Sequence, residues 1–470
     1  MIGADAPAIQ AVSRDGRTFT FDEPGATALV AGDLVVLHQP DHRPVLGQVL
    51  DHGGGRLDEV TQGSGSLIGV LGEDGAIQPT TGRPFASASL EPASARHLED
   101  LQASRKAALS IGQWSLCGVE VAARLRAQGF GRHTFLCGQS GSGKTYALGV
   151  ILEQLLAETD LRMVVLDPNA DFVRLGEPRS DAPPEAARRL SQLKIRVLGA
   201  DATAAEPLRM RFATMPRTAQ AALLQLDPLA DRGEYNSFLH LLADDVPQEV
   251  DAVVEHLRQG GPDGTSLAQR IENLGMMDWE VWAGELPSAA EVVGNDPRLT
   301  VLDLSGFRTP QEPLAVCLDL IETLWAQRTS RTPTLIVLDE AHNICPAEPA
   351  DPVQAALVER LIQIAAEGRK YGLWLLLSTQ RPSKIHPQVL SQCDNLVLMR
   401  MNSPADIAEL ADVFGFAPEG MLRSSRFFKQ GEALVAGGFV PVPSIIRMGA
   451  RLTFEGGGDV PVPERSAAGL

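Results

Sequence analysis

Short apolar runs alternate with turn-forming residues over the first 90 residues of the chain. The runs TFTFDE, ALVAGDLVVLH, PVLGQVLD and SLIGVLGEDG are separated by Gly, Pro, Asp and His. Short strands at this spacing are typical of a closed antiparallel sheet. We therefore predict a small N-terminal β-barrel over residues 1–90 and a connecting segment over residues 91–130.

The pattern changes after residue 130 to continuous apolar runs that alternate with amphipathic helices. The strand-length runs are HTFLCG, LRMVVLD, KIRVLG, LTVLDLSG, TLIVLDE, LWLLLST and NLVLMRM. Such strands, alternating with helices, indicate a mainly parallel sheet that is covered on both faces. The predicted fold class is α/β, with a core formed by residues 131–207 and 297–450. Residues 208–296 have helical periodicity and form a predicted helical insertion, and residues 451–470 form a C-terminal tail.

Composition narrows the class of protein without naming its function. The 470 residues are 44% hydrophobic, carry a formal net charge of −18, and include five cysteines without CxxC spacing. No apolar run is long enough to cross a bilayer, and the N-terminal residues lack a secretory signal, so we expect a cytoplasmic protein without membrane contact. The net negative charge argues against a protein that binds nucleic acid over its whole surface. It leaves open a basic inner surface that contacts DNA.

A Gly-rich loop follows the strand-like run HTFLCG and precedes a helical pattern. The segment GQSGSGKT fits G-x-x-x-x-G-K-[ST] in the strand–loop–helix context that a phosphate-binding loop requires. Its backbone N–H groups would surround phosphate oxygens, Lys144 would bridge the β- and γ-phosphates of ATP, and the Thr145 hydroxyl would bind Mg²⁺. A chance Gly/Ser-rich turn is the alternative. The loop residues are Gly138, Gln139, Ser140, Gly141, Ser142, Gly143, Lys144 and Thr145.

Two adjacent acids end the apolar run TLIVLDE. Asp339 would hold Mg²⁺ through water, and Glu340 would polarise the attacking water. An ordinary acidic helix start is the alternative interpretation. Beside a phosphate-binding loop, the pair favours ATP hydrolysis over a GTP switch and predicts a RecA-like P-loop ATPase core.

The stretch EGRKYGLWLLLSTQRPSKI places cations before an apolar strand and an amide after it. If that strand lies between the P-loop strand and the Asp339 strand, Gln380 emerges beside the γ-phosphate. Arg369 lies in the last turn of a predicted helix, where it could simply stabilise the helix dipole. The second interpretation is an arginine finger that reaches the ATP of a neighbouring subunit.

In this order, the motifs resemble the HerA family of hexameric P-loop ATPases. The matching pieces are GRHTFLCGQSGSGKT, VLDLSG, LIVLDEAHN, EGRKYGLWLLLSTQRPSKI and NLVLMRMNSPADIAEL. The resemblance implies an N-terminal barrel, a helical insertion, a homo-oligomeric ring and translocation of double-stranded DNA. It also implies that Arg369 acts in trans and that Arg132, otherwise a surface cation, contacts nucleotide.

Proteins that resemble HerA work with partner enzymes, so the resemblance implies a NurA-like nuclease or a defence effector, either a nuclease or a sirtuin-like enzyme. Two other hypotheses remain open: an ATP-dependent assembly scaffold for a defence effector, and a DNA pump of the FtsK or conjugation type. Basic residues suited to a DNA channel occur at Arg209, Arg211 and Arg217 and in residues 423–430, although either group could be an ordinary solvated face.

Overall fold

The computed structural model describes residues 9–23, 29–52, 61–73, 75–80, 82–116, 118–200, 206–243, 250–295 and 297–457. The chain divides into two compact units. The first combines Met1–Leu161 with Leu324–Ala450, and the second combines Arg162–Thr323 with Arg451–Leu470.

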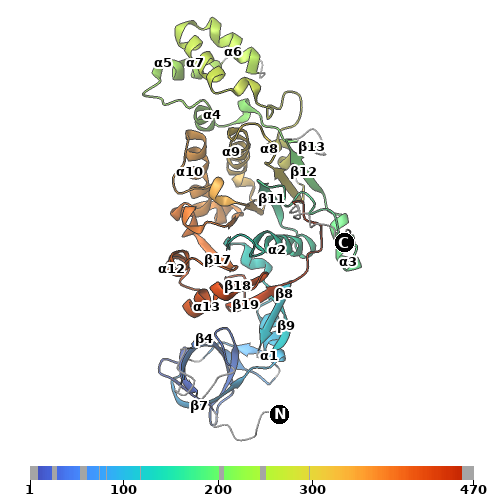
Figure 1. The fold of residues 1–470 in the computed structure, drawn as a ribbon, viewed down its shortest axis with the longest axis vertical. Helices are drawn as coiled ribbons and strands as arrows, with labels where there is room; N and C mark the ends of the chain where they lie inside the picture. Colours follow the sequence, from blue (N-terminus) through green and yellow to red (C-terminus); the bar gives the residue numbers. More distant parts are fainter. Residues whose placement is uncertain are drawn as a thin grey trace, which may run out of the picture. The chain divides into compact units, whose positions relative to one another are not determined.

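The N-terminal part of the first unit is a closed barrel of six strands in the order β2-β1-β7-β3-β4-β5, closed by the β2–β5 pairing. Figure 1 draws it in blue, with β4 and β7 labelled. The prediction of a small barrel is confirmed, although the first and last strands were not among the predicted runs, because β1 is short and β7 is largely polar. The strands are β1 (Ile9–Ser13), β2 (Thr18–Glu23), β3 (Leu34–His38), β4 (Val45–His52), β5 (Thr61–Leu71) and β7 (Phe85–Pro92); the short strand β6 (Ile77–Gln78) pairs with β5.

Side chains fill the interior of the barrel. Phe19, Phe21 and Leu37 are almost fully buried there, and Gly63 and Gly65 of β5 face the two aromatic rings. A Cβ on Gly65 would lie 2.2 Å from Phe19 Cζ and 2.3 Å from the Gln48 carbonyl oxygen. Glycine at this position therefore lets the rings and the neighbouring strand approach closely.

Replacing Gly65 with alanine is expected to destabilise the barrel by about 1–3 kcal/mol, because the added methyl overpacks a filled interior. Urea unfolding followed by tryptophan fluorescence and circular dichroism measures the change. Gly415→Ala is the matched control, since no atom lies within 4 Å of a Cβ built there. Equal stability of the two variants would contradict the packing argument.

The rest of the first unit contains an open mixed sheet in the order β15-β16-β10-β17-β18-β19-β8-β9. The β15, β16, β10 and β17 strands are parallel, and the remaining pairings are antiparallel. The bounds are β8 (Leu109–Leu116), β9 (Val119–Leu125), β10 (His133–Cys137), β15 (Thr334–Leu338), β16 (Leu373–Thr379), β17 (Cys393–Leu398), β18 (Glu432–Gly437) and β19 (Ser444–Met448). The α/β fold with a mainly parallel core is confirmed. The segment predicted only to connect the domains contributes the β8–β9 hairpin to this sheet.

The helices of the first unit are α1 (Ala95–Ser104), α2 (Lys144–Glu158), α10 (Pro352–Glu367), α11 (Pro387–Leu390), α12 (Pro404–Val413) and α13 (Glu419–Ser424). Among the described residues, no helix combines the length and hydropathy that a membrane span requires.

The second unit has its own parallel strands in the order β13-β12-β14-β11. They are β11 (Arg162–Asp167), β12 (Ile195–Gly199), β13 (Glu206–Pro207) and β14 (Leu299–Asp303). Its helices are α3 (Pro184–Ser191), α4 (Arg217–Leu223), α5 (Arg232–Leu241), α6 (Val250–Gln259), α7 (Gly261–Asn273), α8 (Ala289–Gly294) and α9 (Gln311–Ala326). The segment from residue 208 to residue 296 contains α4 to α8, and α5, α6 and α7 lie together in Figure 1.

A buried carboxyl group on α9 makes the stability of the second unit depend on pH. Burial raises the pKa of Asp319 to about 7; the Glu291 carboxylate adds to the rise, and the backbone and guanidinium of Arg211 oppose it. The unfolded chain releases this proton near pH 4, so between about pH 4 and pH 7 the folded state holds more protons than the unfolded state. Asp319 therefore costs the folded state nothing below about pH 4, and its contribution lowers the free energy of unfolding as the pH rises to about 7.

We therefore expect Asp319→Asn to remove this loss and to be more stable than the natural chain at pH 8, by up to about 4 kcal/mol. The gain should shrink toward zero near pH 4. Chemical unfolding at several pH values between 4 and 8 measures it, with Glu285→Gln, an exposed position in the same unit, as control. Parallel stability curves for the natural chain and the Asp319 variant would refute the assignment.

Candidate functional site: a phosphate-binding loop at the carboxyl edge of the sheet

The Gly-rich loop joins β10 to α2 at the carboxyl edge of the parallel strands. Gly141 and Gly143 have positive φ values of 71° and 93°, which glycine adopts without strain. The loop is fixed at its start because the Gly138 N–H donates to the Thr379 carbonyl at 3.3 Å and the Gln139 N–H donates to the Arg400 carbonyl at 3.0 Å. This strand–loop–helix arrangement is the one that the motif requires.

Lys144 begins α2 and points its ammonium into a buried group of acceptors. Its Nζ lies 3.0 Å from Asp339 Oδ1, 3.0 Å from Glu340 Oε1 and 3.1 Å from Ser378 Oγ. Burial opposes the charged form of Lys144, but the two carboxylates outweigh burial and raise the pKa of the amine. A protonated lysine is therefore held where the strand ends meet.

The two acids follow β15 directly. Asp339 is fully buried, and Glu340 has a left-handed backbone with φ 43°, which turns its carboxylate toward the lysine. The Gln380 amide donates to Glu340 Oε1 at 2.9 Å. Burial alone would raise the pKa of Glu340, but Lys144 and Gln380 lower it overall, so the carboxylate is ionised at neutral pH.

The strand order places Gln380 as the sequence analysis expected. The β16 strand pairs with β10 on one side and with β15 on the other, both in parallel. The carboxyl ends of parallel strands meet at one edge of a sheet, so Gln380 emerges between the loop and the paired acids. Its role beside a γ-phosphate stays a prediction.

Two members of this group were not assigned a role from the sequence. Ser378 Oγ donates to Asp339 Oδ1 at 2.7 Å and also accepts from Lys144. His342 Nδ1 lies 3.3 Å from Glu340 Oε2 and 3.1 Å from Thr379 Oγ1, and burial lowers the pKa of His342, which favours the neutral imidazole. Neither belongs to a general motif, although both lie within three residues of one that was identified.

The donor set fits Mg²⁺ and ATP phosphates. Asp339 Oδ2 is buried and has no hydrogen-bond partner among the described residues, which leaves one hard oxygen available. The Ser142 hydroxyl is likewise buried without a partner in that part of the chain, whereas Ser140 is exposed and Thr145 is half-buried. An ammonium, loop N–H groups and a spare carboxylate oxygen are the groups that a magnesium–triphosphate complex uses.

Arg132 and Arg369 lie at the opposite edge of the sheet. Arg132 directly precedes β10, and Arg369 lies in a 3₁₀ turn (Gly368–Tyr371) between α10 and β16, after the helix has ended rather than in its last turn. Arg132 precedes the start of the P-loop by six residues of extended chain, which span about 20 Å. Neither guanidinium therefore reaches the Lys144 group of its own chain.

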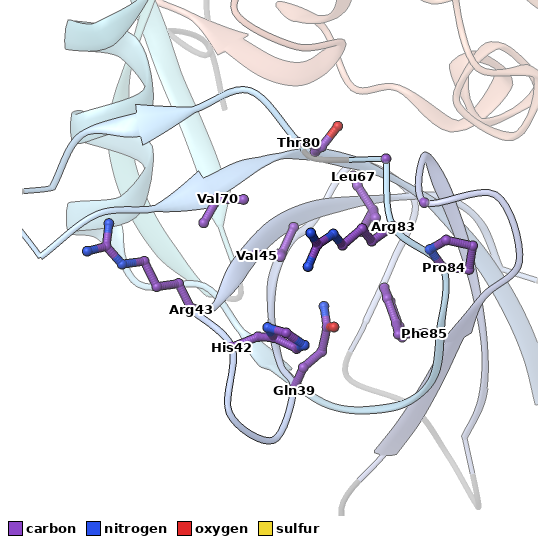
Figure 2. A pocket seen from close by; sticks show the side chains of 12 residues that line it. Gln39, His42, Arg43, Val45, Leu67, Val70, Thr80, Arg83, Pro84 and Phe85 are labelled. Atoms are coloured by element: carbon purple, nitrogen blue, oxygen red, sulfur yellow. The ribbon is translucent and has the colours of Figure 1, made fainter.

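A separate cavity of about 220 Å³ lies in the barrel and contains none of these residues. Figure 2 shows Gln39, His42 and Arg83 around its opening, with Val45, Leu67 and Phe85 also lining it. Within the described chain, neither Arg43 nor Arg83 pairs with a carboxylate, and no acidic residue is part of the lining. The lining thus contains two arginines and no acid, in a chain that is acidic overall.

Comparisons with known proteins agree with the loop and its fold. Residues 110–247 match the family model described as the central domain of helicase HerA, and residues 288–401 match the AAA family of ATPases. The solved structure of VirB4 from Thermoanaerobacter pseudethanolicus covers 73% of this chain and 96% of its own at 16% identity, with a TM-score of 0.51, so the two share a fold.

Curated relatives match over the ATPase region. A protein named as a probable DNA double-strand break repair helicase HerA from Methanocaldococcus jannaschii is 29% identical over 143 residues, which are 30% of this chain and 27% of the relative. HerA of Sulfurisphaera tokodaii is 29% identical over 116 residues, 25% of this chain and 23% of the relative. The match spans about a quarter of each relative's length. The phosphate-binding loop, its paired acids and the match to the AAA family identify the chain as a P-loop ATPase, and over its ATPase region it is similar to the HerA helicases.

Proposed function

We propose that this chain hydrolyses ATP as a subunit of a homo-oligomeric ring that translocates double-stranded DNA. One observation supports the proposal above all: Arg132 and Arg369 are separated from the phosphate-binding loop of their own chain by the length of a strand. A subunit with its arginines at one edge and its loop at the other can complete a neighbour's site but not its own. Rings of such subunits couple hydrolysis to contact between neighbours, and the resemblance to HerA supports six of them.

The chain's own residues would perform the hydrolysis as follows. The loop N–H groups and Lys144 would hold the phosphates, while Thr145 and Asp339 would hold Mg²⁺, which neutralises charge on the phosphates. Glu340, ionised and held by Gln380, would take up the proton of the attacking water. The ammonium of Lys144 would exchange carboxylate contacts for phosphate oxygens.

Duplex DNA would be held mainly through its phosphates, so binding should weaken with added salt and show little sequence preference. Of the basic residues considered for this contact, Arg211 donates to the carbonyls of Gly284 and Leu286 and is not freely available. Arg423 pairs with Glu419. Arg426 is exposed and lies beside the 83% exposed Phe427, so residues 426–429 are the better candidate.

A partner enzyme, either a nuclease or another defence effector, would account for any chemistry on DNA or nucleotide beyond ATP hydrolysis. The barrel cavity of Figure 2 supports docking of an acidic segment of such a partner, because its lining includes Arg83 and contains no acid. A labelled poly-glutamate peptide is the probe: Arg83→Glu should abolish its binding at low salt, whereas Arg96→Glu on α1 should not. Unchanged binding in the Arg83 variant would exclude the cavity as the docking site.

The alternatives differ in what hydrolysis is for. In an assembly scaffold, ATP binding organises an effector and hydrolysis only regulates it. In a pump of the FtsK or conjugation type, hydrolysis also drives the movement of DNA, but the DNA is moved for a different purpose. Full biological activity of a Glu340→Gln variant would favour the scaffold over either motor.

ATP hydrolysis measured over a series of protein concentrations, with and without linear duplex DNA, tests the proposal. We expect the rate to rise faster than linearly with protein concentration, because the site is completed between subunits, and we expect DNA to stimulate it. A linear rate that ignores DNA would reject the ring motor and leave the scaffold.

A further inference from the structure

One carboxylate oxygen holds both arginines at the amino edge of the sheet. Asp394 Oδ2 accepts a hydrogen bond from Arg132 Nη1 at 3.0 Å and lies 3.6 Å from Arg369 Nη1. All three side chains are between 44% and 47% exposed. The group is therefore open to solvent and to a neighbouring molecule.

The sheet brings these residues together from three separate segments. The β10 strand lies between β16 and β17, and Arg132, Arg369 and Asp394 are at the amino ends of these three strands. His133 adds no charge to the group, because burial lowers its pKa to about 4 and its Nδ1 accepts from the Leu375 N–H. The net charge of the cluster thus comes from two guanidiniums and one carboxylate.

Two guanidiniums at this spacing repel each other, and the carboxylate between them offsets the repulsion. Because the group is exposed, each ion pair is weak enough to exchange for a more highly charged acceptor such as a phosphate. Each guanidinium has five N–H donors, so its contact with one oxygen leaves most of its donors facing outward.

We propose that Asp394 is a positioning residue that holds Arg132 and Arg369 together as one cationic unit for the triphosphate of a neighbouring subunit. The inference rests on the proposed function in so far as it names that phosphate as the target. The carboxylate itself does not touch the nucleotide. It fixes the directions from which the two arginines approach, which is a requirement of charge stabilisation by preorganised groups.

The kinetic test is Asp394→Asn, which keeps the size of the side chain and removes its charge. We expect kcat for ATP hydrolysis to fall about 10- to 100-fold, as a misplaced catalytic group does, while KM for ATP stays within about twofold. In a background that carries both Arg132→Ala and Arg369→Ala, the same change should have no further effect, because Asp394 acts through the two arginines. Glu120→Gln is the matched control, since Glu120 forms an exposed ion pair with Arg447 in the same unit. A normal kcat, or a full additional loss in the background that lacks both arginines, would overturn the proposal.

A second measurement is independent of ATP hydrolysis. Phenylglyoxal modifies arginine side chains, and the rate at each arginine is read by peptide mass spectrometry. In Asp394→Asn we expect both Arg132 and Arg369 to react severalfold faster, with Arg447 unchanged. Unchanged rates at both arginines would overturn the proposal even if the chain is an active ATPase. A chain without ATPase activity at any concentration would instead reject the proposed function, and the modification rates would still decide whether Asp394 holds the pair.

Discussion

A Glu340→Gln variant should bind ATP with an affinity close to that of the natural chain and hydrolyse it about 10²- to 10⁴-fold more slowly, the range that loss of a general base gives. The amide has the shape of the carboxylate and can still accept from Gln380, but it cannot take up a proton. Lys144, which pairs with Glu340 in the structure, would exchange that contact for phosphate oxygens when ATP binds. We therefore expect the variant to keep its affinity for ATP while it loses most of its hydrolysis rate.

Binding of a fluorescent ATP analogue and single-turnover hydrolysis measure the two effects. Glu359→Gln, at an exposed position on α10, is the control and should be unaffected in both. A Glu340 variant with kcat within threefold of the natural chain would remove Glu340 from the mechanism and leave His342 as the next base to examine, since it lies 3.3 Å from the same carboxylate.

Replacing Arg369 with alanine should lower kcat by about 10³- to 10⁵-fold, the range that arginine fingers contribute, at protein concentrations where subunits associate. The defect should lie in the neighbour's site, because Arg369 and Lys144 occupy opposite edges of one subunit. Mixing Arg369→Ala subunits with Lys144→Ala subunits should then restore part of the activity, since each kind supplies what the other lacks.

The mixing experiment is read as hydrolysis at constant total protein while the ratio of the two variants changes. Activity should reach a maximum at intermediate ratios. Arg447→Ala, which removes another exposed arginine of the same unit, should leave the natural rate unchanged. If Arg369→Ala subunits alone hydrolyse ATP normally, Arg369 only stabilises the end of its helix and the arginine-finger interpretation is wrong.

The sequence was informative where local pattern and chemistry coincide. The phosphate-binding loop has fixed spacing, and Asp339, Glu340 and Gln380 follow apolar strands whose carboxyl ends meet in any parallel sheet. Their presence at one edge could therefore be expected from the sequence, but their mutual contacts required β16 to lie between β10 and β15.

The rest depended on long-range pairing that no local pattern encodes. The β8–β9 hairpin alternates weakly and joins the sheet only through β19, far away in sequence. Asp394 is 25 residues beyond Arg369, at the second position of β17, and only the placement of β10 between β16 and β17 makes it a shared partner of two arginines. Ser378 and His342 are common residues whose roles follow from contacts rather than from spacing.

The packed interior of the N-terminal barrel limits the route that a DNA duplex can take. A barrel of eight strands is just wide enough for its own side chains, and this one has six, with Phe19, Phe21 and Leu37 inside. Among the described residues, these side chains occupy the lumen, and the cavity of Figure 2 is far too small for a duplex. If the proposed ring moves DNA, the duplex would have to pass outside each barrel, so surface residues of that domain and not its lumen would meet the nucleic acid.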